Sequence, residues 1–202
     1  MARHYVIALL ALGAASVPAQ ASPVQPSPDS VRERIDLRKL STCLAERRPD
    51  WARKTLALPY LSQAQMRSAM AGVSDSGSCM RGLEIDLRYS GVVGSLAEHY
   101  LQSDLKRADA RRLAAALSKL EPLNTSEDFA LCVVARNPAA ARDLALSEPG
   151  SQAETEAVGR LESAVGPCTA ADEKFTVDLQ SLRALTSTAL YRGVSTVLAS
   201  ND

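Results

Sequence analysis

The four cysteines of the chain have a repeated spacing, and this feature constrains the fold more than any other. They lie at Cys43, Cys79, Cys132 and Cys168, so 36 residues separate the members of the first pair and of the last pair. Moving the sequence by 89 positions places one pair on the other, and 11 of the 37 residues from Cys43 to Cys79 are then identical without a gap. We interpret the chain as a tandem duplication, with repeats over residues 30–105 and 125–202.

The duplication predicts how the cysteines pair. Four cysteines allow three pairings. If both repeats descend from one ancestral unit, each closes its own disulfide, which gives Cys43–Cys79 and Cys132–Cys168. A disulfide that closes a loop of this length stabilises a folded repeat by roughly 4 kcal/mol in the chain-entropy model, because it restricts the unfolded chain. A structural zinc site is the alternative, but the cysteines lack close Cys-x-x-Cys spacing and the chain has only His4 and His99 to add.

The N-terminus has the pattern of an export signal. Arg3 and His4 precede an apolar run that Pro18 ends, and Ala19-Gln20-Ala21 is a small-x-small cleavage pattern. We expect a signal peptide over residues 1–21 and a proline-rich leader over residues 22–29. A membrane anchor is the alternative, but about 13 apolar residues are fewer than the roughly 20 that span a bilayer. The sequence therefore predicts a periplasmic or secreted protein that is not an integral membrane protein.

Helix signals recur at matching places in the two repeats. Pro49 and Pro138 suit the first turn of a short helix, and Ser62-x-x-Gln65 and Ser151-x-x-Glu154 are capping boxes for a longer one. We predict a mainly α fold built from a disulfide-linked four-helix repeat, with a helical linker over residues 106–124.

Two segments instead alternate apolar and polar residues with a period of two. They are Leu83–Tyr89 in the first repeat and Phe175–Leu179 in the second. This period indicates a half-buried strand. We expect the two strands to pair as an antiparallel ribbon, with Asp86 and Asp178 on its outer face.

Composition excludes several function classes. The chain has 23 basic and 23 acidic residues, whereas a nucleic-acid-binding surface needs an excess of positive charge. The sequence contains no phosphate-binding or dinucleotide-binding glycine motif, so we expect no cofactor and no metal.

Candidate catalytic residues are few. His99 follows Glu98 in a segment with helical periodicity, and a catalytic interpretation makes His99 a general base that Glu98 orients. Helix neighbours at i and i+1 do not face each other, however. A structural histidine is therefore the preferred interpretation.

The second repeat contains Phe129-Ala-Leu-Cys132-Val-Val-Ala-Arg136-Asn-Pro138, followed by Pro149-Gly150-Ser151-Gln-Ala-Glu154. With these motifs, most of the chain after the expected signal peptide resembles a family of small exported alphaproteobacterial proteins that have no assigned function, and the second repeat resembles it more closely than the first. A family-like helix is partly kept as Val93-Gly94-Ser95-Leu96-Ala97-Glu98. The resemblance implies export and a repeated helical architecture, and it implies no activity.

Two function classes follow from these observations. We expect a non-catalytic envelope protein, a binding or structural module whose partner is an envelope protein or a small ligand. A small periplasmic hydrolase that uses His99 is the alternative.

Overall fold

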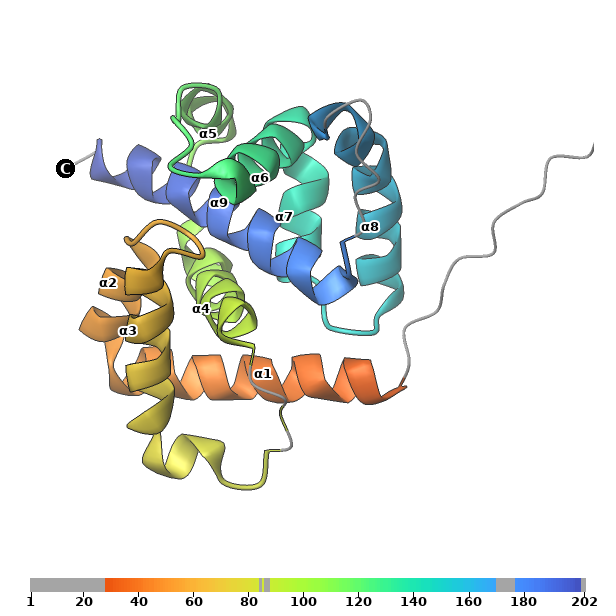
Figure 1. The fold of residues 1–202 in the computed structure, drawn as a ribbon. Helices are drawn as coiled ribbons and strands as arrows, with labels where there is room; N and C mark the ends of the chain where they lie inside the picture. The colour runs from red at the N-terminus through yellow and green to blue at the C-terminus, as the bar shows by residue number, and fades with distance from the viewer. Residues whose placement is uncertain (1–27, 84, 86–87, 170–176, 201–202) are drawn as a thin grey trace, which may run out of the picture.

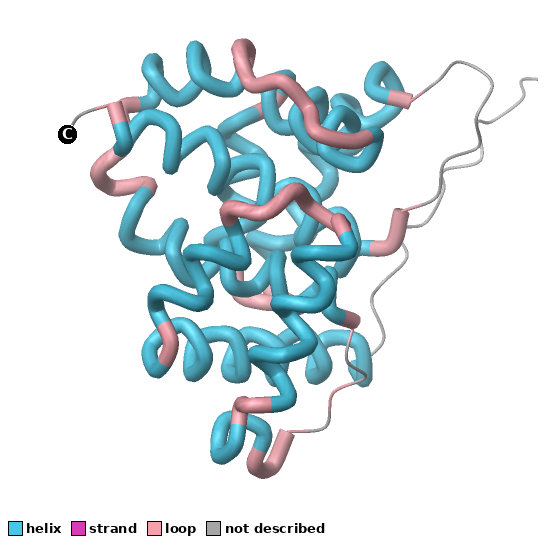
Figure 2. The backbone as a smooth tube through the Cα atoms, turned by 60° about the vertical axis from the view of Figure 1, so that its left-hand side comes forward, coloured by secondary structure: helices cyan, strands magenta, loops and turns pink. Residues whose placement is uncertain are grey.

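The protein is built from helices joined by short loops. The computed structural model describes residues 28–83, 85, 88–169 and 177–200, and within these residues it contains nine α-helices, two short 3-10 helices and no strand. Figure 2 shows this composition along the backbone. The first half contains α1 (Pro28–Arg47), α2 (Pro49–Leu56), α3 (Gln63–Ser74), η1 (Gly77–Met80) and α4 (Tyr89–Asp104). Helix α5 (Ala110–Leu117) follows. The second half contains α6 (Thr125–Arg136), α7 (Pro138–Leu146), α8 (Gln152–Val165), η2 (Gly166–Cys168) and α9 (Leu179–Ala199).

The elements follow one another in the same order in the two halves. Helices α1 and α6 end at Arg47 and Arg136, which are 89 positions apart, and α2 and α7 each begin with a proline. Helices α3 and α8 are capped by Ser62 and Ser151, whose hydroxyl oxygens accept a backbone N–H three residues on. The halves differ in the first helix, because α1 has 20 residues and α6 has 12.

The disulfides join the cysteines in the pairing that the spacing predicts. Cys43 of α1 is bonded to Cys79 of η1. Cys132 of α6 is bonded to Cys168 of η2. Each bond therefore connects the first helix of a half to the turn that follows its third helix.

Helices α4 and α9 form the centre of the molecule (Figure 1) and pack against each other more extensively than any other helix pair. They approach closely at Gly94, where an added Cβ would lie 2.4 Å from the Cα of Ala184. Burial on α4 is not confined to one face of the helix. Every residue from Gly91 to Glu98 is buried, because helices from both halves surround α4.

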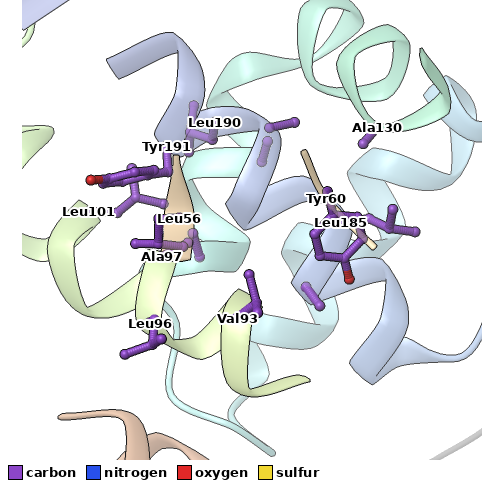
Figure 3. Packing of buried hydrophobic residues seen from close by; sticks show 14 of the residues in the cluster. Leu56, Tyr60, Val93, Leu96, Ala97, Leu101, Ala130, Leu185, Leu190 and Tyr191 are labelled. Atoms are coloured by element: carbon purple, nitrogen blue, oxygen red, sulfur yellow. The ribbon is translucent and has the colours of Figure 1, made fainter. Parts of the chain in front are cut away.

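One apolar core runs through both halves. Figure 3 shows Leu56 and Tyr60 from the first half and Ala130 from the second around the residues of α4 and α9. Leu56 and Tyr60 are 1% and 2% exposed. A core without a boundary between the halves predicts that they unfold together.

The predicted ribbon of strands is not confirmed. Residues 84, 86–87 and 175–176, including Asp86, lie outside the described part of the two segments. Within that part, Leu83, Ile85, Arg88, Val177 and Asp178 are not in strands. Tyr89 and Leu179 are the first residues of α4 and α9.

In the described residues of these two segments, the alternation of apolar and polar side chains has a cause other than a strand. The carboxylate of Asp178 accepts the N–H of Ser181 and so caps α9, a role that favours aspartate for a reason unrelated to strands. Leu83 and Ile85 are partly buried against the core. A connection that touches the core with every second residue produces the same period as a strand.

Residues 106–124, which we expected to form a helical linker, contain helix α5, and residues 106–109 and 118–124 form turns and loops. Helix α5 packs Leu113 and Leu117 close to Gly193 of α9, where an added Cβ would lie 2.7 Å from Leu117. At the N-terminal end, α1 begins at Pro28, inside the expected leader of residues 22–29, since proline suits the first turn of a helix. The expected signal peptide lies outside the described residues. Among the described helices, none combines the length and the apolar character needed to cross a bilayer.

Candidate functional site

Glu98 and His99 point to different surroundings, so they do not form a catalytic pair. Glu98 is 5% exposed and accepts two hydrogen bonds from the guanidinium of Arg183, at 3.0 Å each. His99 is half-buried, and its ring contacts the ring of Tyr100 edge-on at 5.2 Å between centroids. The catalytic interpretation needs Glu98 to orient His99, and Glu98 is instead held by Arg183.

The surroundings of His99 favour its neutral form. Burial lowers the pKa of His99 below its usual value, and the positive charge of Arg53 acts in the same direction against the carboxylates of Glu46 and Asp104. Ser103 lies one turn further along α4, but its hydroxyl donates to the carbonyl of Tyr100 and to Asp104. The neighbouring serine is therefore not arranged as a nucleophile that His99 activates.

The structure assembles a different set of charged residues, which we name the Arg–Glu cluster. It consists of Arg34 and Arg38 on α1, Glu98 on α4, Glu154 on α8 and Arg183 on α9. Arg183 lies at its centre and is 4% exposed. Besides its paired bonds to Glu98, it donates to Glu154 at 2.8 Å and to the hydroxyl of Ser147 at 3.0 Å.

The N-terminal half of α1 completes the cluster from the other side. Arg34 donates to the second oxygen of Glu154 at 2.9 Å. Arg38 donates to Glu98 at 3.3 Å and to the carbonyl oxygen of Ser147 at 2.6 Å. This part of α1 reaches the second half of the chain, as Figure 1 shows for α1 and α8. The cluster thus joins α1 and α4 of the first half to α8 and α9 of the second.

The arrangement stabilises the charged forms despite their burial. Burial alone would lower the pKa of the Arg183 guanidinium, but the carboxylates of Glu98 and Glu154 outweigh this effect and raise it above its ordinary value. The cluster contains three guanidiniums and two carboxylates. The third compensating carboxylate is Glu148, which lies 2.8 Å from Arg38 and is exposed over 78% of its side chain.

A third buried carboxylate connects the halves at another place. Glu127 of α6 is 4% exposed and accepts the backbone N–H of Tyr60 at 3.0 Å. It also pairs with Arg192 of α9 at 2.8 Å. The amide of Asn124 donates to the carbonyl oxygen of Tyr60 at 2.6 Å. The loop after α2 is therefore fixed to the start of α6.

The sequence signals only part of the Arg–Glu cluster. The capping box predicts that Glu154 lies at the start of α8, and its side chain does accept the N–H of Gly150 at 2.7 Å. No local pattern predicts its arginine partners, because Arg34 is 120 positions away. Arg183 lies between apolar residues of α9, and a charged residue in that position is the one signal that could have indicated a buried ion pair.

An open groove of about 450 Å³ lies along the exposed face of α1 beside the cluster. This volume is in the range of small-molecule sites, about 300–1,000 Å³. Its lining includes both charge signs and the apolar side chain of Ile35, which is 37% exposed. The lining residues are Ile35, Arg38, Lys39, Thr42, Cys43, Glu46 and Glu148.

The described residues offer no evident metal centre. In the ranges that the structure describes, no three His, Cys, Asp or Glu side chains lie together so that they could hold a metal ion. All four cysteines are in disulfides. Comparison of the chain with protein-family models, with curated proteins and with solved structures found no match.

Proposed function

We propose that the chain is an exported, duplicated helical protein that acts without catalysis, as a binding or structural module of the cell envelope. The observation that carries the proposal is the pair of disulfides with equal spacing, which close equivalent parts of the two halves. Structural disulfides persist in oxidising compartments. The signal-like N-terminus and the resemblance of the second repeat to small exported proteins support the same compartment.

Export has a direct test. The chain is expressed in a bacterium with its own leader, and the periplasmic fraction is analysed by N-terminal sequencing and by non-reducing peptide mapping. We expect a protein that begins at Ser22 and carries Cys43–Cys79 and Cys132–Cys168. A membrane-bound protein with an intact N-terminus would contradict export by cleavage.

The groove along α1 is the best-supported place for a partner. It is an open hollow of about 450 Å³, and Ile35 and charges of both signs line it. The test compares partner capture from periplasmic extract by the wild type, by Ile35→Glu, and by the control Met70→Glu. Met70 is 45% exposed and lies on α3, outside the groove. We expect a captured protein to be lost only with Ile35→Glu, and equal capture by all three would contradict the groove.

The alternative of a small hydrolase rests on His99 alone. Two observations argue against it. Glu98 is bound by Arg183 and does not orient His99, and the Ser103 hydroxyl donates to the carbonyl oxygen of Tyr100. It is tested with a fluorophosphonate probe, which labels activated serines. We expect no labelling of the wild type, and labelling that His99→Gln abolishes would overturn the non-catalytic proposal.

A further inference from the structure

A small cavity lies where α1, α4 and α9 meet, beside the Arg–Glu cluster. Its volume is about 20 Å³. A cavity needs about 10–15 Å³ to hold one water molecule, so this cavity has room for one. The polar and charged side chains of its lining are Arg34, Ser95, Glu98, Gln180 and Arg183. No residue lines both this cavity and the groove along α1, so the two are separate features of the molecule.

The cavity lining concentrates polar atoms that lack a partner within the protein. In the described part of the chain, four buried side-chain nitrogen or oxygen atoms find no hydrogen-bond partner, and three of them belong to this lining. They are Nε of Arg34, Oγ of Ser95 and Nε2 of Gln180. Arg34 and Ser95 are 6% and 7% exposed. A buried polar atom without a partner is costly, so the lining favours an occupant that forms hydrogen bonds.

The charges around the cavity favour a neutral occupant. The three guanidiniums of the Arg–Glu cluster are matched by three carboxylates, which are Glu98, Glu154 and Glu148. Glu98 lines the cavity and would repel an anion, whereas Arg34 and Arg183 on the same lining would repel a cation.

The three unpartnered atoms match the bonding capacity of water. Nε of Arg34 and Nε2 of Gln180 can only donate, whereas the hydroxyl of Ser95 can also accept. One water oxygen can accept from both nitrogens, and one of its hydrogens is then available for Ser95. Buried waters typically form about three hydrogen bonds, so these three partners are sufficient.

The backbone of α4 leaves the space that the Gln180 amide occupies. An added Cβ at Gly91 would lie 2.7 Å from Nε2 of Gln180 and 2.9 Å from Cδ2 of Leu37. Glycine at this position therefore lets the amide reach the cavity wall.

We propose that this cavity is a binding site for one structural water molecule that joins the two halves of the chain. The water accepts from Nε of Arg34 and Nε2 of Gln180, and it donates to Oγ of Ser95. Arg34 and Ser95 lie on α1 and α4 of the first half, and Gln180 lies on α9 of the second. The water thus adds a hydrogen-bonded link between the halves at the edge of the Arg–Glu cluster.

A high-resolution crystal structure of the oxidised chain gives a direct test. We expect one water peak within hydrogen-bond distance, about 2.7–3.2 Å, of Arg34 Nε, Ser95 Oγ and Gln180 Nε2. Direct hydrogen bonds among these three side chains, with no density between them, would overturn the proposal. Density for an ion in this position would overturn it as well.

Oxygen-17 magnetic relaxation dispersion gives an independent test in solution, because it counts water molecules that stay bound for longer than surface waters. The double variant Ser95→Ala/Gln180→Met removes two of the three partners. The control Ser163→Ala/Gln152→Met makes the same exchanges at exposed positions of α8. We expect the wild type and the control to hold one more long-lived water than the double variant, with circular dichroism showing that all three are folded. Equal counts for the three folded proteins would refute the proposal, and the crystal structure tests it without any substitution.

Discussion

Replacing Glu154 by glutamine tests the energetic role of the Arg–Glu cluster. The substitution keeps the shape of the side chain and removes its charge. The amide oxygen can still accept the N–H of Gly150, but it cannot accept from Arg34 and Arg183 at both ends of the group. The cluster then contains three guanidiniums and one carboxylate.

The expected loss of stability is large. Breaking a buried ion pair by removing one partner costs about 3–5 kcal/mol, because the other charges remain buried without compensation. The retained backbone bond places Glu154→Gln near the lower end, at about 3 kcal/mol. For a domain of this size the midpoint of thermal unfolding falls by about 2–4 °C per kcal/mol, so we expect a decrease of about 6–12 °C.

The control is another acid-to-amide exchange in an ion pair of similar length. Asp143 lies 2.6 Å from Arg160, and both side chains are about half exposed. An exposed pair contributes about 0–1 kcal/mol, so Asp143→Asn should have little effect. Stability is measured by urea unfolding of the oxidised chain, followed by circular dichroism and by Trp51 fluorescence. A loss for Glu154→Gln no larger than that for Asp143→Asn would refute the reasoning.

Three further predictions concern the rest of the fold. Burial lowers the pKa of His99, so the folded state binds fewer protons than the unfolded state below about pH 6.5. The free energy of unfolding therefore falls as the pH drops below about 6.5. The variant His99→Gln should lose this part of the slope between pH 7.5 and pH 5 in urea titrations, and an unchanged slope would contradict it. Gly94→Ala should lower the free energy of unfolding by about 1–3 kcal/mol, because the added Cβ meets α9. The control Gly159→Ala in α8, whose Cβ has nothing within 4 Å, should be neutral or stabilising by up to about 1 kcal/mol. Calorimetry of the oxidised chain should show one transition, and the second repeat expressed alone should be far less stable. Two separable transitions would show that the halves do not share a core.

The parts of the fold that the sequence predicts depend on local chemistry. Ser62 and Ser151 cap helices because a hydroxyl next to the first turn accepts an N–H whatever the rest of the chain does. Pro49 and Pro138 begin helices for a similarly local reason. The cysteine pairing follows from the repeated spacing, which is visible without knowledge of the packing.

The Arg–Glu cluster could not be predicted because its partners are far apart in the sequence. Glu98 is 85 positions from Arg183, and nothing near either residue indicates the other. The proximity of Glu98 to His99 in the sequence suggested a pair that packing does not form. The strand prediction is not confirmed for a different reason, because the alternation near Asp178 reflects a local helix cap that has the same spacing as a strand.

The matching positions of the two halves show how side chains join the halves into one body. Gln65 and Glu154 are 89 positions apart, and each accepts the N–H four residues before it at the start of a helix. Gln65 uses its amide nitrogen within its own half, where it donates to the carbonyl oxygens of Thr55 and Leu58. A carboxylate cannot donate these bonds, and once buried it needs cations. Glu154 obtains them from Arg183 and from Arg34, and Arg34 lies in the part of α1 that extends beyond the length of α6. The acid in place of an amide and the longer first helix are therefore complementary, because the helix of the first half supplies one of the two cations that stabilise the charge buried in the second half.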